Sequence, residues 1–207
     1  MLKRTMGRSL LTLLVVTGLA GTINDTSISK KERKFGTGML KDTRDAAIDA
    51  TRGLSDAQLN YKAAPEKWSV KECMFHIAGA EKLLWTMFEG VMKAPANPEK
   101  RAEIKVTDEQ LIAMIQDRSK KAQAPEPIQP KNTGFNSLDE AMADFKKNRN
   151  DHIKYLKTST EDLRNHVVQM PFGYIDCYQF LLFMAAHSNR HTQQMNEVKA
   201  DAGFPQQ

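Results

Sequence analysis

Four short sequence patterns mark helix starts in this chain, and they constrain its fold more than any other feature. In each, a Ser, Thr or Asp is followed three residues later by Glu or Gln, so that two side chains can satisfy exposed backbone N–H groups. The patterns begin at Ser69, Thr107, Ser137 and Asp176. Alternation typical of a strand is confined to short pieces such as Val167 to Met170. The sequence therefore predicts an all-α protein.

The predicted elements are four long helices and one short helix. The first begins near Ser27 and ends at Gly53, a residue that adopts the left-handed conformation of a helix end at little cost. The segment 93–136 contains five prolines and is too long for a tight turn, but it suits a crossover connection in a four-helix bundle. The predicted helices span residues 27–52, 69–92, 107–122, 137–158 and 176–200.

The composition is that of one folded domain. Of 207 residues, 41% are hydrophobic and 27% are charged, which excludes a disordered or collagen-like chain. The formal charge of +5 includes Lys3, Arg4 and Arg8, and residues 21–207 carry only twenty-seven basic against twenty-five acidic side chains. The charge therefore gives no argument for a nucleic-acid partner.

Residues 1–20 have the pattern of an export signal. A basic stretch over residues 1–8 precedes an apolar run over residues 10–20 that ends in small side chains. We expect cleavage near Ala20, which makes residues 27–205 an exported domain, periplasmic or secreted, with no membrane partner after signal removal. The alternative is an uncleaved anchor, although about eleven apolar residues are too few to cross a bilayer.

Three histidines lie on helix faces that are predicted to point into the bundle. His187 and His191 are one turn apart on the last helix, and His76 shares its face with Leu84 and Met87. A lone inward histidine is more often a hydrogen-bonded core residue. Several clustered imidazoles, however, need partners for their nitrogen atoms, and a divalent metal ion provides them. Three ligands would leave an open position, as in catalytic zinc sites.

Two motifs resemble those of a known family. Residues 68–76, WSVKECMFH, resemble the WSxxExxxH opening of the second helix in DinB-like (YfiT-like) proteins, and residues 187–194, HSNRHTQQ, resemble their HxxxHxxQ last helix. The resemblance covers residues 35–205 approximately. It implies a four-helix bundle with up-down-down-up connectivity, often a homodimer, in which the three matching histidines bind zinc or nickel. Arg190 departs from the family, because many members carry a histidine there.

The resemblance leaves three classes of function open. The leading expectation is an exported metal-dependent hydrolase, in which His76, His187 and His191 hold the metal ion and an activated water attacks a small ester, amide or related substrate. The alternatives are a metal-dependent transferase for a thiol or another small nucleophile, and a non-enzymatic metal- or ligand-binding bundle. Export favours hydrolysis over thiol transfer, because reduced thiol pools are maintained inside cells.

Two side chains of the third long helix are candidate catalytic residues. Arg149 and His152 lie on its predicted inner stripe, where Arg149 would bind a substrate carboxylate or phosphate and His152 would transfer a proton. The alternative, which we favour, is structural: Arg149 pairs with a carboxylate such as Asp42 or Asp49, and His152 reaches solvent at the edge of the stripe. Gln194 is expected either to orient a ligand or to pack between helices.

Two further features concern packing. Helix geometry places Cys73 and Cys177 about 10 Å or more apart along the helix axes, so both are expected to be free thiols. The second long helix is apolar on its back as well as on its histidine face. Its back is expected to pack against the first helix, against residues 107–122, or against a second copy of the chain.

Overall fold

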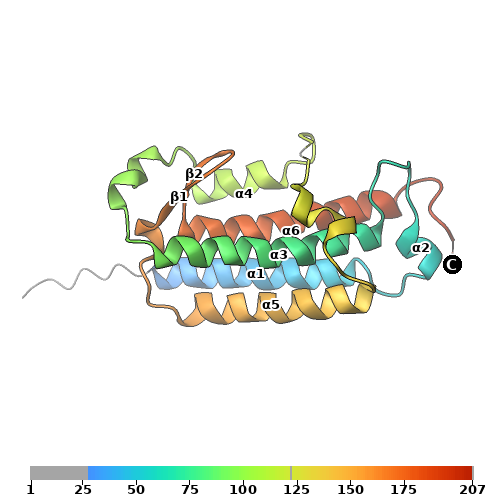
Figure 1. Cartoon of the computed structure of the whole chain (residues 1–207), viewed down its shortest axis with the longest axis horizontal. Coiled ribbons are helices and arrows are strands. Elements are labelled where there is room, and N and C mark those ends of the chain that lie inside the picture. Colours follow the sequence, from blue (N-terminus) through green and yellow to red (C-terminus); the bar gives the residue numbers. More distant parts are fainter. Residues whose placement is uncertain (1–27, 122, 207) are drawn as a thin grey trace, which may run out of the picture.

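The structure is a computed structural model that describes residues 28–121 and 123–206, so the predicted signal segment lies outside the described residues. Four long helices pack side by side: α1 (Lys30–Asp49), α3 (Val70–Lys93), α5 (Leu138–Thr158) and α6 (Cys177–Lys199). In Figure 1, α1 and α6 run from left to right, whereas α3 and α5 run from right to left. The predicted helical bundle and its up-down-down-up connectivity are therefore confirmed.

Shorter elements connect the long helices. The chain between α3 and α5 carries a further helix that packs on α6, and 3₁₀ segments that pack on α3, as the predicted crossover requires. A hairpin precedes α6, with Val167 opposite Asp176 and Met170 opposite Gly173. These elements are α2 (Asp56–Asn60), η1 (Pro98–Glu103), α4 (Asp108–Gln116), η2 (Glu126–Ile128), η3 (Pro130–Asn132), η4 (Leu163–Asn165), β1 (Val167–Met170) and β2 (Gly173–Asp176). None of the described helices is long and apolar enough to span a membrane.

The helix starts follow the capping chemistry read from the sequence. Reciprocal capping boxes form at Ser69, Thr107 and Asp176, while Ser137 caps α5 without the return bond. Two further boxes, at Ser29 and Ser55, start α1 and α2. The prediction overlooked both patterns, so it began the first helix three residues early and missed α2.

The helix α4 is shorter than predicted. It ends at Gln116 rather than near residue 122, because Asp117 takes an extended conformation with ψ 103°. The guanidinium group of Arg190, on α6, donates hydrogen bonds to the carbonyl groups of Ile115 and Asp117. A side chain from another helix thus satisfies the carbonyl groups that a longer α4 would have used.

The apolar back of α3 packs within the chain, on α5. The ring of Trp85 stacks on His152 with 3.9 Å between centroids, and the buried Phe88 meets Tyr155 edge to face. Trp85 and Phe88 of this back thus pack on α5, a helix that the expectation did not include, and the homodimer stays a prediction. Met87, which was expected on the inner face with His76, is 40% exposed.

One arginine joins the starts of three helices. Arg164, in η4, donates hydrogen bonds to the carboxylates of Glu32, Asp108 and Asp176, which lie in the first turns or caps of α1, α4 and α6. The hydroxyl of Tyr178 donates to the carbonyl oxygen of Glu32 at 2.7 Å. Residues distant in the sequence are thus fixed at one end of the bundle.

The two cysteines are free and buried, as predicted. Cys73 lies in α3 and Cys177 is the first residue of α6, and each belongs to a buried hydrophobic cluster. Burial raises the pKa of both thiols, that of Cys177 to about 12. Both therefore behave as small apolar core residues at neutral pH.

Candidate metal centre

The structure brings the three predicted histidines together. His76 lies near the start of α3, and His187 and His191 lie at and just beyond the middle of the antiparallel neighbour α6. One ring nitrogen from each histidine can be chosen so that all three lie within 4.8 Å of one another. The Nε2 atoms of His76 and His187 are 3.3 Å apart. Two nitrogens bound tetrahedrally at about 2.0–2.1 Å from one ion would be separated by roughly the same distance.

The three imidazoles are neutral at physiological pH. Burial lowers the pKa of His76, and burial together with the neighbouring imidazoles lowers the pKa of His187 to about 3 and that of His191 well below its usual value. A neutral imidazole keeps one nitrogen lone pair, which is the form that binds a metal ion. The three imidazole rings can therefore bind a cation without first losing a proton.

Neighbouring acceptors fix the hydrogen on two of the rings. The Nδ1 of His76 lies 2.7 Å from the carbonyl oxygen of Ile128, and the Nδ1 of His191 lies 3.0 Å from the Oε1 of Gln194. Both oxygens accept, so each Nδ1 carries the hydrogen and each Nε2 keeps its lone pair. Gln194 also accepts a hydrogen bond from Arg118 at 3.4 Å, which supports this orientation of its amide. Gln194 thus orients the ring of His191, and its role toward a metal ligand stays a prediction.

Aromatic side chains surround the imidazoles. Trp68, just before the cap of α3, has its ring centroid 4.8 Å from that of His76 and 5.8 Å from that of His191. Phe183, one turn before His187, lies 6.0 Å from its ring. The ring nitrogens of the cluster are therefore flanked by apolar rings.

Arg149 lies in the interior, as predicted, but with a different partner. Its guanidinium group forms two 2.7 Å hydrogen bonds to the carboxylate of Glu81, on α3. Neither Asp42 nor Asp49 pairs with it, so that part of the prediction is wrong. The remaining N–H groups reach acceptors on α1 and α6, including Thr43 and Ser188. Every donor of this fully buried guanidinium group is therefore used within the chain.

His152 completes the same buried network rather than reaching solvent at an edge. Its Nδ1 lies 2.7 Å from the Oε1 of Glu81, and its ring is covered by Trp85. Burial alone would raise the pKa of Glu81, but the charge of Arg149 overrides this effect and lowers it to about 2. The network is thus an ionised carboxylate held between an arginine and an imidazole. The geometry favours the structural alternative for Arg149, and the catalytic roles of both residues stay predictions.

The network adjoins the histidine cluster, but Arg149 forms no hydrogen bond to any of the three histidines. Glu81 follows His76 by five residues, about 7.5 Å along the axis of α3. Ser188, which accepts from Arg149 at 2.7 Å, directly follows His187. Sequence reasoning missed Glu81, because it lies between the faces assigned to the histidines and to the apolar back.

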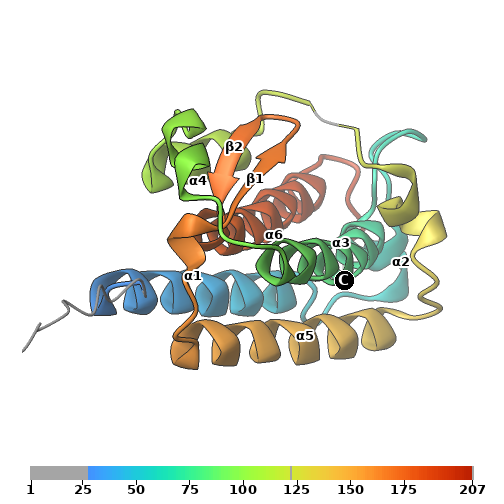
Figure 2. The same ribbon diagram turned by 60° about the vertical axis from the view of Figure 1, so that its left-hand side comes forward.

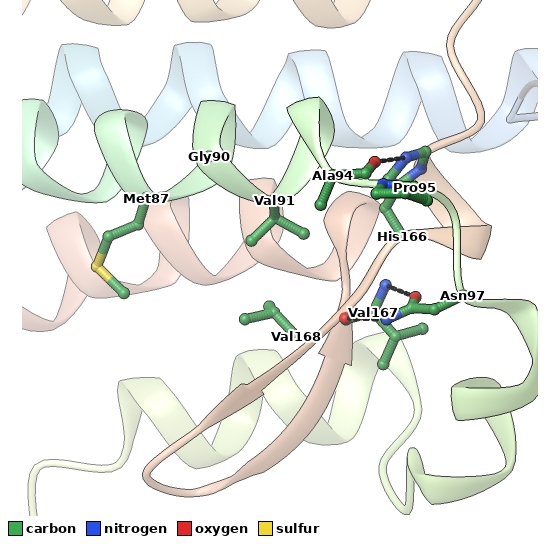
Figure 3. A pocket seen from close by; sticks show the side chains of 9 residues that line it. All are labelled: Met87, Gly90, Val91, Ala94, Pro95, Asn97, His166, Val167 and Val168. Atoms are coloured by element: carbon green, nitrogen blue, oxygen red, sulfur yellow. Dashed lines mark hydrogen bonds between the residues drawn. The ribbon is translucent and has the colours of Figure 1, made fainter.

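The side chains of Glu72 and His166 have partners away from the cluster. Glu72 completes the capping box of Ser69 and pairs with Lys62 at 3.1 Å, as its position in the box predicts. His166 lies 2.8 Å from the carbonyl oxygen of Asp162. It lines a pocket of about 440 Å³ at the far end of α3 from His76, between the helix and β1 (Figure 3).

The fold and this site place the chain in a family. The DinB superfamily matches residues 39–195, and the chain belongs to it. Among individual proteins, it is 29% identical over 150 residues to the uncharacterized protein YuaE of Bacillus subtilis (strain 168), across 72% of this chain and 87% of that protein. Its fold is similar to that of YfiT from Bacillus subtilis, with a TM-score of 0.60 and 16% identity over 86% of this chain and 92% of that one. YfiT is described as a probable metal-dependent hydrolase with an unusual four-helix bundle topology.

Proposed function

We propose that this protein is a metal-dependent hydrolase whose divalent ion, zinc or nickel, is held by His76, His187 and His191. One observation carries the proposal: three neutral imidazoles converge, and two of them already have their outer Nδ1 atoms bound to protein acceptors. An arrangement in which outer partners fix the ligand rings is characteristic of metal sites. The similarity to YfiT supports the same interpretation.

The metal ion and the side chains around the cluster have different roles. A divalent ion with an open position supplies Lewis acidity and lowers the pKa of water. Gln194, held by Arg118, keeps His191 in the ligating orientation. The rings of Trp68 and Phe183 provide apolar walls for a small ester, amide or related substrate. Arg149 is assigned no contact with substrate in this proposal, because its donors are already used.

We further propose that the chain is exported. The basic stretch before Arg8 and the apolar run over residues 10–20 support this location. Fractionation of the producing cells, with mass spectrometry of the purified chain, tests both export and cleavage. A full-length chain in the cytoplasmic fraction would contradict the proposal.

The metal centre is tested by metal analysis of protein purified without chelators. We expect about one equivalent of a divalent metal in the wild type and less than a tenth of that in His187→Ala, because two imidazoles bind much more weakly than three. His166→Ala is the matched control, since His166 lies at the far end of α3, and it should retain the metal. Equal metal contents in wild type and His187→Ala would reject the ligand assignment.

Hydrolysis is tested separately with a panel of small esters and amides. We expect turnover that is lost on chelation, restored by zinc or nickel, and absent in His187→Ala. His152→Gln tests the predicted proton transfer through the pH dependence of kcat at unchanged metal content. If the wild type binds metal but turns over no member of the panel, the non-enzymatic metal-binding bundle replaces the hydrolase.

A further inference from the structure

One end of the bundle gathers lysines from two helices that are distant in the sequence. Arg33 of α1 donates a 2.5 Å hydrogen bond to the carbonyl oxygen of Leu156, which fixes the start of α1 beside the end of α5. Five exposed lysines occupy these two helix ends, and together they are called the basic end: Lys30, Lys31, Lys34, Lys154 and Lys157. Figure 1 shows these helix ends side by side, at the left of the bundle.

The charge of the basic end is not neutralised within the described part of the chain. None of its five lysines forms an ion pair with a carboxylate there. The nearby carboxylates have other partners, since Glu32 pairs with Arg164, Asp151 with Lys147, and Glu161 accepts from a tyrosine hydroxyl. A concentration of positive charge therefore faces solvent on a protein whose overall charge is small.

An exposed aromatic ring lies among these lysines. Phe35 follows Lys34 on α1 and is 49% exposed, more than any other large hydrophobic side chain of the described residues. A single exposed ring needs no explanation by itself. Beside unpaired lysines, however, it gives the surface both properties needed at a lipid interface: basic groups for anionic headgroups and an apolar ring for the acyl boundary.

In place of the expectation that the exported chain has no membrane partner, we propose that the basic end, with Phe35, binds the surface of a membrane rich in anionic phospholipids. This orientation directs the histidine cluster away from the lipid. Tyr178 is level with the start of α1 through its bond to Glu32, and His187 lies nine residues farther along α6, about 14 Å away along the axis. The cluster would then lie away from the lipid while the basic end contacts the membrane.

Binding of the full chain to lipid vesicles tests the proposal. We expect the wild type to sediment with vesicles of equal parts phosphatidylglycerol and phosphatidylcholine, and much less with phosphatidylcholine alone. Replacing all five lysines of the basic end by glutamine should weaken binding at least about a hundredfold, because each basic residue near an anionic surface adds to the free energy of binding. Raising the salt concentration should weaken wild-type binding in the same direction.

A control variant separates position from net charge. It carries the same five-charge change at exposed lysines elsewhere, and we expect it to bind nearly as the wild type does: Lys67, Lys120, Lys121, Lys131 and Lys146. Equal weakening in the two variants would overturn the proposal, because it would show a dependence on total charge alone. Equal wild-type binding to both vesicle compositions, or binding to neither, would also overturn it.

A fluorescent reporter gives a measurement that does not depend on the five-lysine variant folding well. In Phe35→Trp, we expect the emission to shift to shorter wavelength on anionic vesicles and to be quenched by brominated lipid. The two native tryptophans, Trp68 and Trp85, lie against histidine rings of the interior and provide a nearly constant background. An unchanged spectrum for Phe35→Trp on vesicles that bind the protein would place the contact on another face and refute the proposal.

Discussion

Replacing Glu81 by alanine should destabilise the protein more than any other single change in the polar interior. The substitution leaves the guanidinium group of Arg149 buried with no carboxylate, because its other partners on α1 and α6 are neutral oxygens. Removing one member of a buried ion pair costs about 3–5 kcal/mol. The lowering of the Glu81 pKa from 4.5 to about 2 corresponds to a preference of about 3 kcal/mol for the ionised over the protonated carboxyl group in the folded protein.

Removing both charges should cost less than removing one. In Glu81→Leu combined with Arg149→Met, no unpaired charge remains, and hydrophobic replacement of buried pairs is often close to neutral. His152 still loses the acceptor of its Nδ1, which costs about 1–3 kcal/mol. We therefore expect the double variant to recover at least half of the loss caused by Glu81→Ala.

Urea unfolding followed by circular dichroism and by tryptophan fluorescence measures these differences. Trp85 reports on the network directly, because its ring covers His152. A loss of less than about 1 kcal/mol in Glu81→Ala, or a double variant at least as unstable as the single one, would refute the reasoning.

The same ion pair predicts a pH dependence. The folded-state pKa of Glu81 is lowered, so its contribution to stability is complete above the unfolded pKa near 4.5 and is lost as the pH falls toward 2. Unfolding free energies measured between these values should fall less steeply for the double variant than for the wild type. Parallel curves would indicate that Glu81 does not carry this dependence.

Three further predictions concern the metal centre and the packing of helices. Gln194→Ala should weaken metal binding about 10–100-fold in competition titrations, whereas Gln193→Ala should leave it nearly unchanged; equal effects would argue against the ligand-orienting role of Gln194. Gly36→Ala should lower the free energy of unfolding in urea by about 1–3 kcal/mol, because the added methyl group would lie 2.8 Å from a leucine methyl carbon of α5. Gly38→Ala should instead stabilise α1 by about 0.5–1 kcal/mol, because no atom lies within 4 Å of the added methyl group. Arg190→Ala should increase amide exchange at the end of α4, since it removes the donors to those carbonyl groups; unchanged exchange would show that α4 ends for another reason.

The sequence predicted the long helices because local chemistry determines them. Capping side chains and helical apolar spacing act within a few residues, and the predicted starts at Ser69, Ser137 and Asp176 agree with the structure. The end of α4 was wrong for the opposite reason. Its carbonyl groups are satisfied by Arg190, seventy or more residues away in the chain, and no local pattern contains that information.

The candidate site shows the same difference between features set by local sequence and features set by distant residues. The two histidines of α6 could be placed on one face from their spacing, and the motif before His76 supplied the third. The acceptor of His76, the carbonyl oxygen of Ile128, lies in an irregular crossover, and backbone carbonyls carry no sequence signal. The partner of Arg149 was predicted on the wrong helix, because an inward arginine indicates that a carboxylate is needed but not which neighbour provides it.

The pairing of the first long helix with the last has a consequence for biosynthesis. α1 packs against α6, and its polar link at Glu32 depends on Arg164 and Tyr178, so its partners leave the ribosome long after α1 itself. A nascent chain that stops before residue 177 cannot cover the apolar side of α1 with α6. The native bundle can therefore close only after α6 has been synthesised, and until then the growing chain is open to chaperones.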